Sequence, residues 1–185
     1  IQTAGFGALG DLGIHMIDAA RFITQLEIKR VIGLAQTLIP LKPDGTGRMQ
    51  KVTTDTNASF LACFQNGMIG TFEATQVAPG YGNFFRIEIS GEKGTLVVLS
   101  EKNTEIQLFA GKTISHHATW QTSTPIHYVP TGFISSQPPS TPGILVDVLR
   151  GSKAVFPTFK DGLVAQRVLA GIIQSMKTNS WVLTA

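Results

Sequence analysis

The sequence predicts an α+β fold in which an open, mostly antiparallel β-sheet carries helices on one face. Several strand-like segments follow one another between residues 55 and 110 with no helical pattern among them, which indicates antiparallel strands rather than repeated βαβ units. Helical periodicity occurs near both ends of the chain, at residues 11–23 and 161–177. The 185 residues are 43% hydrophobic and 15% charged, enough apolar material for one core, so residues 1–185 are expected to form a single domain.

A glycine-rich segment that leads into a helix, residues 5–23, contains the best candidates for chemistry. Asp11 and His15 are four positions apart, so on an α-helix they share one face, where the carboxylate can orient the imidazole. The pair also has a purely structural interpretation, because the helix dipole favours a carboxylate in a first turn. Apolar residues around the rest of this helix predict that most of it is buried.

The segments that follow predict a strand, an exposed loop and a series of hairpins. Residues 28–39 are rich in β-branched side chains and favour a strand. Residues 41–54 contain proline and glycine and are expected to be an exposed loop without regular structure. From residue 55 onward, alternating side chains and turns at Asn66-Gly67 and 91–94 predict antiparallel strands as far as residue 109.

The last third of the chain combines an aromatic excursion with two further helices. Residues 111–142 lose all periodicity but keep several aromatic side chains. Helices are expected at residues 144–150 and 161–177, with Asp161 as the N-cap of the second. Residues 181–183 are expected to be an edge strand or a tail.

Charge and composition argue against several classes of function. The net charge of +3 comes from scattered Lys and Arg residues, so no nucleic-acid partner is indicated. No apolar run reaches the roughly 18 residues that a membrane span needs. His116, His117 and His127 lack metal-ligand spacing, so no metal site is expected. Cys63 is the single cysteine and cannot form an internal disulfide, which favours a reducing, cytoplasmic compartment.

Residues 5–10, Gly-Phe-Gly-Ala-Leu-Gly, fit the GxGxxG pattern of dinucleotide-binding loops. That pattern functions between a preceding strand and a following helix, and only four residues precede Gly5. A flexible helix entry is the favoured interpretation, and no cofactor-binding residue is expected in this chain. Because the chain begins at Ile1, without an initiator methionine, it is expected to be part of a longer protein.

Four segments spread over nearly the whole chain form a recognisable series. They are GALGDLGIHMID at residues 7–18, a segment ending in FQNGMIGT at 55–71, IEISGEKGTL at 87–96 and DGLVAQRVL at 161–169. In this order they resemble the GGGxLxDxGxHxxD signature, the FxNGxxGT sheet segment, the IxGxxGxL hairpin and the last helix of the Gfo/Idh/MocA family, the group of glucose-fructose oxidoreductase and inositol dehydrogenase.

The resemblance implies a two-domain enzyme with an N-terminal Rossmann domain, absent from this chain, and a C-terminal domain with an open antiparallel sheet. The family's DxxxH pair falls on Asp11 and His15. The resemblance implies that His15 exchanges a proton with a substrate hydroxyl and that Asp11 orients His15. The resemblance also implies that hydride moves to or from NAD or NADP, which a Rossmann domain of the parent protein is expected to bind. The family's EKP lysine has no counterpart, because Glu92-Lys93 lies in a predicted turn. This fragment alone is therefore expected to be inactive and to bind no cofactor.

Two hypotheses about function follow from these observations. In the first, the chain is the substrate-binding and dimerisation domain of an NAD(P)-dependent dehydrogenase for a sugar, polyol or similar small hydroxylated compound, with His15 and Asp11 handling the proton. In the second, it is a non-catalytic interaction module that homodimerises through one face of its sheet, and the same pair is structural. Lys51, Trp120 and His127 are further candidates for substrate contacts.

Overall fold

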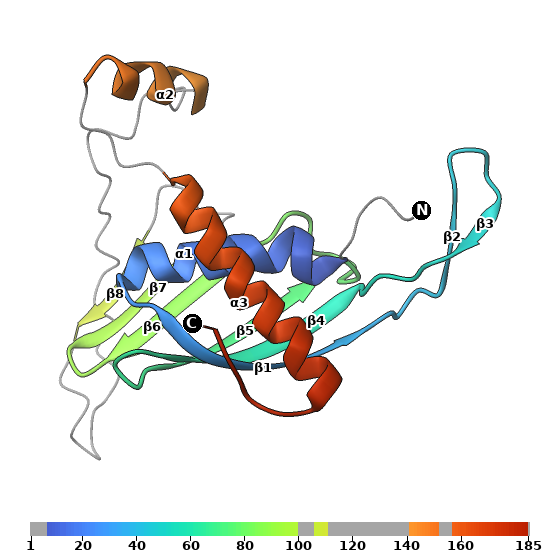
Figure 1. Ribbon diagram of the computed structural model, residues 1–185, viewed down its shortest axis with the longest axis horizontal. Helices are drawn as coiled ribbons and strands as arrows, with labels where there is room; N and C mark the ends of the chain where they lie inside the picture. Colours follow the sequence, from blue (N-terminus) through green and yellow to red (C-terminus); the bar gives the residue numbers. More distant parts are fainter. Residues whose placement is uncertain (1–6, 100–105, 111–140, 152–156, 185) are drawn as a thin grey trace. The chain divides into compact units, whose positions relative to one another are not determined.

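The computed structural model describes residues 7–99, 106–110, 141–151 and 157–184 (Figure 1). They belong to two compact units, one made of Ile1–Ala78 and Phe156–Ala185, the other of Pro79–Val155. Residues 111–140, which include Trp120 and the three histidines of the excursion, lie outside the described residues.

A four-stranded sheet forms the base of the first unit. Its order is β5-β4-β1-β9, and every pairing in it is antiparallel, as predicted. The strands are β1 (Ile28–Gln36), β4 (Asn57–Phe64), β5 (Ile69–Thr75) and β9 (Val182–Leu183). Gly67 closes the predicted β4–β5 turn with a φ of 88°, a left-handed conformation that glycine adopts without strain. β9 pairs with β1, so the last segment is an edge strand rather than a tail.

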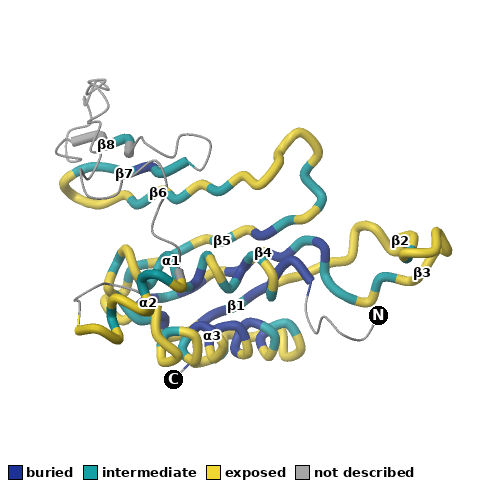
Figure 2. Tube along the Cα trace, turned by 90° about the horizontal axis from the view of Figure 1, so that it is seen from above, coloured by how far each residue is buried: buried dark blue, intermediate teal, exposed yellow. Residues whose placement is uncertain are grey.

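Two helices, α1 (Ile14–Thr24) and α3 (Phe159–Thr178), pack against the inner face of this sheet. Alternate residues of β4 point inward, and all four are buried: Ala58, Phe60, Ala62 and Phe64. Figure 2 shows the buried parts of β1, β4 and α3 facing one another. Among the described helices, none is both long and apolar enough to cross a membrane.

Side chains of helix α3 pack directly against the backbone of β1 at Gly33. A Cβ on Gly33 would lie 2.8 Å from Cγ2 of Ile172, so only glycine allows this approach. The amide of Gly33 donates a 3.0 Å hydrogen bond to Oγ of the buried Ser175, and that hydroxyl donates to the carbonyl of Ile172. The helix and the strand are therefore joined by a polar contact inside the core.

The start of α3 differs from the prediction. Thr158, rather than Asp161, is the N-cap, and Asp161 is the third residue of a capping box. Oγ1 of Thr158 accepts from the amide of Asp161, while the Asp161 carboxylate accepts from the amide of Thr158 at 2.8 Å. A hydroxyl followed three residues later by an acidic residue is the usual form of this motif, with aspartate here in place of glutamate.

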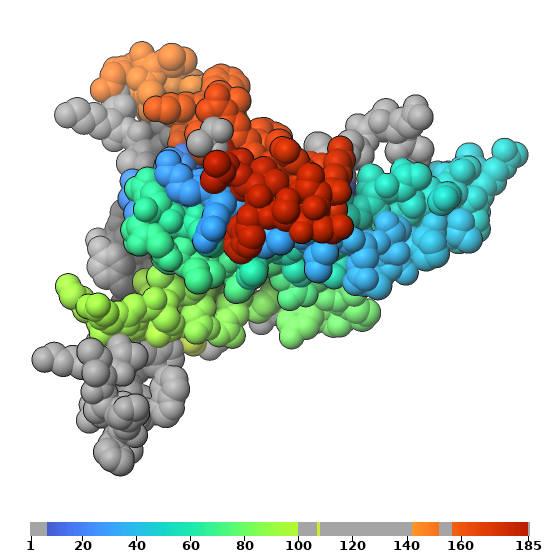
Figure 3. Space-filling model, turned by 60° about the horizontal axis from the view of Figure 1, so that its bottom comes forward, coloured from blue at the N-terminus to red at the C-terminus, as the bar shows by residue number. Residues whose placement is uncertain are grey.

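The segment expected to lack regular structure is a β-hairpin, so that prediction was wrong. β2 (Leu41–Pro43) and β3 (Met49–Lys51) pair with each other, and all their residues are exposed. The carboxylate of Asp44 organises the turn, because it accepts from the amide and hydroxyl of Thr46, the amide of Arg48 and Nε2 of Gln50. The hairpin projects beyond the rest of the first unit (Figure 3).

The opposite face of the sheet, which we call the open face, has no helix of the first unit on it. Side chains on it alternate with the buried ones, and four of its apolar residues are exposed: Leu34 (73%), Leu61 (40%), Ile69 (70%) and Leu183 (74%). The guanidinium carbon of Arg30 lies 5.0 Å from the centre of the Trp181 ring, which is a cation–π contact. An apolar surface of this kind is typical of an interface.

The described residues of the second unit form a three-stranded antiparallel sheet and one helix. The sheet order is β6-β7-β8, with β6 at Arg86–Gly91, β7 at Gly94–Leu99 and β8 at Ile106–Ala110. Glu92 and Lys93 form the turn between the first two strands, as predicted. Helix α2 covers Thr141–Leu149, three residues before the predicted start.

Candidate functional site

The entry to the first helix is fixed by a single residue, Asp55, which precedes β4. The Asp55 carboxylate accepts from the amide of Gly7 at 3.0 Å and from the amide of Leu9 at 2.7 Å. The backbone carbonyl of Asp55 accepts from the amide of Ala8, also at 3.0 Å. Three successive amides that start a helix thus find their acceptors on one residue, which also places a negative charge where the helix dipole favours it.

Gly7 is required by this arrangement. A Cβ at Gly7 would lie 1.6 Å from the carbonyl oxygen of Asp55, far inside van der Waals contact. In a dinucleotide-binding loop, amides at such a helix start would be offered to a pyrophosphate. Here the amides of Gly7, Ala8 and Leu9 are already occupied by Asp55. The described part of the GxGxxG segment therefore acts as a helix entry.

The first turn of the helix is a π-helix, η1 (Leu9–Gly13), and not the α-helix that the periodicity predicts. Leu9 is buried, at 2% exposed, and Gly13 is also buried, whereas Asp11 lies on the exposed side of this turn. π-Helical turns are rare and occur frequently at functional sites. Asp11 is thus presented by a wide turn whose two ends are packed into the core.

His15 follows in the first turn of α1, and its side chain is also exposed. Asp11 and His15 therefore lie on successive turns of one continuous helical segment, both accessible to a small molecule. Within the described residues, however, no hydrogen bond joins them: Oδ2 of Asp11 accepts from Nε2 of Gln76 at 3.2 Å. Orientation of His15 by Asp11 stays a prediction, and the residue that contacts Asp11 is one that the sequence did not single out.

Gln76 comes directly after β5 and is fixed by its backbone. Its amide donates to the carbonyl of Thr56 at 2.9 Å, which extends the β4–β5 pairing by one residue. Its side chain is on the same side of the strand as Ala74, which is 2% exposed. In the sequence, Gln76 is recognisable only as part of that inward-facing series, because its partner Asp11 lies 65 positions away.

The other end of α1 is held by Arg21. Its guanidinium donates two 2.8 Å hydrogen bonds to the carboxylate of Glu27 and lies 3.8 Å from a carboxylate oxygen of Asp161 at the start of α3. The hydrogen bond from Arg21 lowers the pKa of Glu27, and the same bond raises the pKa of Arg21. Helix α1 is therefore anchored by Asp55 at its entry and by Arg21 near its end.

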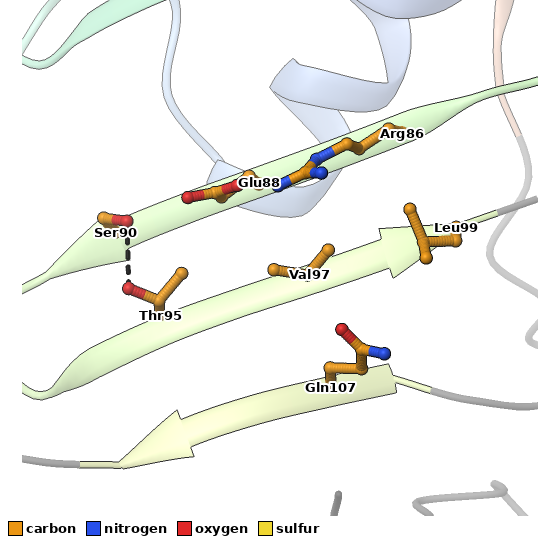
Figure 4. A pocket seen from close by; sticks show the side chains of 7 residues that line it. All are labelled: Arg86, Glu88, Ser90, Thr95, Val97, Leu99 and Gln107. Atoms are coloured by element: carbon orange, nitrogen blue, oxygen red, sulfur yellow. Dashed lines mark hydrogen bonds and ion pairs between the residues drawn. The ribbon is translucent and has the colours of Figure 1, made fainter. Parts of the chain in front are cut away.

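A second cluster of polar side chains lies on one face of the sheet in the second unit (Figure 4). It surrounds a hollow of about 370 Å³ lined by Arg86, Glu88, Ser90, Thr95, Val97, Leu99 and Gln107. Arg86 is paired with Glu88, and the hydroxyls of Ser90 and Thr95 are 3.0 Å apart. Because the guanidinium of Arg86 offers only donors and is paired with the Glu88 carboxylate, this cluster is poorly suited to proton transfer.

Of the three further residues predicted to contact a substrate, only one lies within the described residues. Lys51 is exposed on β3 of the projecting hairpin, whereas Trp120 and His127 lie outside the described residues. Across the described ranges, no group of three or more His, Cys, Asp or Glu side chains could hold a metal ion. Asp11 and His15 thus remain the residues whose chemistry fits an acid–base site.

The described residues form antiparallel sheets, and helices cover one face of the four-stranded sheet. This arrangement is that of an α+β domain with an open antiparallel sheet. Residues 2–97 match the GFO/IDH/MocA C-terminal domain, and the chain belongs to this family. The predicted resemblance and fold class are confirmed.

Individual relatives are similar over almost the whole chain. Levoglucosan dehydrogenase of Pseudarthrobacter phenanthrenivorans is 28% identical, over 98% of this chain and 52% of its own. The crystal structure of an oxidoreductase domain protein from Kribbella flavida has a TM-score of 0.77 and 32% identity, with 98% of this chain and 52% of that chain covered. Levoglucosan dehydrogenase in complex with NADH and levoglucosan has a TM-score of 0.79 and 27% identity, with 97% and 51% covered. This chain thus spans about half the length of the curated relative that it matches.

Proposed function

We propose that this chain is the substrate-binding domain of an NAD- or NADP-dependent dehydrogenase that oxidises a hydroxyl group of a sugar, polyol or similar small compound. The observation that carries the proposal is the exposed Asp11 and His15 on a helix entry fixed by Asp55, in a chain of the GFO/IDH/MocA family. Similarity to levoglucosan dehydrogenase, which has been solved with NADH and levoglucosan, supports a sugar as the class of substrate.

The chemistry assigned to this chain is the transfer of a proton. When an alcohol is oxidised to a carbonyl, the O–H bond releases a proton and the adjacent C–H bond releases a hydride. An imidazole that titrates near neutrality can accept the proton, which makes His15 the general base and, in the reverse direction, the general acid. Asp11, one helical turn before His15, is the residue proposed to orient the imidazole.

The hydride acceptor would be a nicotinamide held by residues outside this chain. Two observations support a dinucleotide site outside this chain: every strand pairing among the described residues is antiparallel, and the Gly7–Leu9 amides bind Asp55. We therefore expect turnover only from the full-length protein. The lone cysteine, Cys63, supports a reducing compartment such as the cytoplasm.

Replacement of His15 tests this role. In the full-length protein, we expect His15→Ala to lower kcat/KM for levoglucosan or a related sugar by about 10²- to 10⁴-fold, because a general base is lost. Gln166→Ala, at an exposed position of α3, is the matched control and should retain the parent activity. A parent that oxidises no sugar or polyol with NAD or NADP, or a His15→Ala variant within a few-fold of it, would contradict the proposal.

The open face supports a second role, homodimerisation, which is the alternative function if Asp11 and His15 are only structural. Leu34, Ile69 and Leu183 are each at least 70% exposed on this face, and a second copy of the chain would cover them. Sedimentation of the full-length protein tests this role. A dimer at micromolar concentration is expected, and a monomer at high micromolar concentration would rule out the open face as a strong self-association surface.

A further inference from the structure

The carboxylate of Asp11 is held by a residue that lies 65 positions away in the sequence, directly after β5. Asp11 is exposed, so its side chain could adopt several rotamers in water. Nε2 of Gln76 donates to its Oδ2 at 3.2 Å and favours one of them. Hydrogen bonds to ionised groups are stronger than those between neutral groups, even where solvent weakens them.

Gln76 is well placed for such a role because its own backbone is fixed. The Gln76 amide bonds the carbonyl of Thr56, and Thr56 directly follows Asp55, whose carboxylate holds the amides of Gly7 and Leu9. Asp55, just before β4, therefore fixes the backbone that leads to Asp11. Gln76, just after β5, holds the Asp11 side chain. Thr56 itself is buried, at 1% exposed, which makes this corner of the sheet a firm support.

The chemistry of the carboxamide distinguishes Gln76 from the cations near α1. Arg21 brings a positive charge to the carboxylates near it, Glu27 at 2.8 Å and Asp18 and Asp161 at 3.8 Å. Gln76 donates a hydrogen bond to Asp11 but places no positive charge beside its carboxylate. Oδ1 of Asp11 accepts no hydrogen bond from the residues that the structure describes, and this leaves one oxygen for an imidazole N–H or a substrate hydroxyl.

We propose that Gln76 is a positioning residue of the acid–base site: its carboxamide occupies one oxygen of Asp11 and directs the other toward His15 and the substrate hydroxyl. This inference rests on the proposed function for its effect on catalysis. The contact between Gln76 and Asp11 is independent of that function and can be tested without measuring activity.

The first test detects the hydrogen bond in the full-length protein labelled with ¹⁵N at glutamine side chains. We expect Asp11→Ala to shift the carboxamide signals of Gln76 more than those of Gln174, an exposed glutamine of α3 that serves as the control. If the Gln76 signals move no more than the Gln174 signals, the inference is overturned, whatever reaction the protein catalyses.

The second test measures the consequence for catalysis. Gln76→Glu keeps the shape of the side chain but replaces the donor by a carboxylate that repels Asp11. We expect kcat for the sugar to fall about tenfold or more, with KM for NAD or NADP unchanged and the midpoint of thermal unfolding close to the parent value. Gln174→Glu, the matched control, should leave kcat unchanged.

Parent-like kcat in Gln76→Glu would overturn the inference, and so would a fall in kcat that only accompanies loss of folded protein. Gln76→Leu provides a second variant that removes the donor without adding charge, and it should lower kcat in the same direction. If the parent protein oxidises no sugar or polyol at all, the proposed function fails, and the labelled-glutamine spectra still decide whether Gln76 holds Asp11.

Discussion

The carbonyl oxygen of Asp55 occupies the position that a side chain on Gly7 would need. The distance from that oxygen to a Cβ built on Gly7 is 1.6 Å, while the Asp55 carboxylate accepts the Gly7 amide at 3.0 Å. A residue before β4 thus touches the helix entry through both its backbone and its side chain. The position of the candidate acid–base site depends on this contact between two segments 48 residues apart.

We expect Gly7→Ala to destabilise the protein by about 3 kcal/mol, because the added methyl group overlaps backbone rather than a flexible side chain. Gly45→Ala is the matched control, since no atom lies within 4 Å of its added Cβ. Urea denaturation of both variants measures the difference. Equal free energies of unfolding would show that the helix entry can move away from Asp55.

Asp55→Ala removes the acceptor of the Gly7 and Leu9 amides and leaves them without a partner at the helix start. We expect a loss of about 1.5–3 kcal/mol in the free energy of unfolding, since both bonds involve a charged group. Amide hydrogen exchange of Leu9–Gly13 should accelerate, while Asp147→Ala on α2 should leave these amides unchanged. Unaltered exchange in Asp55→Ala would contradict the role of Asp55 as anchor.

Ser175→Ala tests the polar contact between β1 and α3. The substitution leaves the buried amide of Gly33 without its 3.0 Å acceptor, so we expect about 1–3 kcal/mol of destabilisation. Ser180→Ala, at an exposed residue, should change the free energy of unfolding by less than about 0.5 kcal/mol. Chemical denaturation of the two variants, compared with the parent, provides the measurement.

The stability of the projecting hairpin should depend on pH because the Asp44 carboxylate holds its turn together. The hydroxyl of Thr46, followed by Nε2 of Gln50, lowers the pKa of Asp44 from 3.8 to about 2 by hydrogen bonding to the carboxylate. Because the folded pKa is depressed, this stabilisation is present above pH 3.8 and is lost as the pH falls toward about 2. Amide chemical shifts of residues 41–51 should follow this transition, and Asp44→Ala should abolish it.

A substitution on the open face should weaken dimer formation without unfolding the protein. Leu34→Asp places a charge at a position that is 73% exposed in one copy and would be buried in a dimer. We expect the dimer dissociation constant to rise by more than about tenfold, because an unpaired charge is costly to bury. Leu163→Asp, at an exposed position of α3, should sediment like the parent. Identical association of both variants would exclude the open face.

Much of the fold could be predicted because its signals are local. The alternation through Phe60, Ala62 and Phe64 has the period of a strand with one buried face, and Asn66-Gly67 has the chemistry of a tight turn. The hairpin at residues 41–51 was missed because exposed strands carry no hydrophobic alternation. Its turn depends on Asp44 side-chain bonds that composition alone does not reveal.

The candidate site was only partly visible for a different reason. Asp11 and His15 are close in sequence, so their spacing pointed to a shared surface. Gln76 and Asp55 reach the same helix entry from distant strands, and no local pattern connects them with it. The π-helical form of Leu9–Gly13 was also missed, because apolar periodicity near a helix start does not distinguish one extra residue per turn.

The core of the first unit combines residues that precede the second unit in the sequence with residues that follow it. Val31 and Phe60 pack in one cluster with Leu169 and Ile172, which a ribosome adds only after residues 79–155 have been made. The β6–β8 meander, by contrast, needs only neighbours along the chain. We therefore expect its contacts to form early during synthesis, while β1, β4 and β5 leave the part of their inner face that α3 covers exposed until α3 emerges. A chaperone that binds apolar strands would have its main opportunity in that interval.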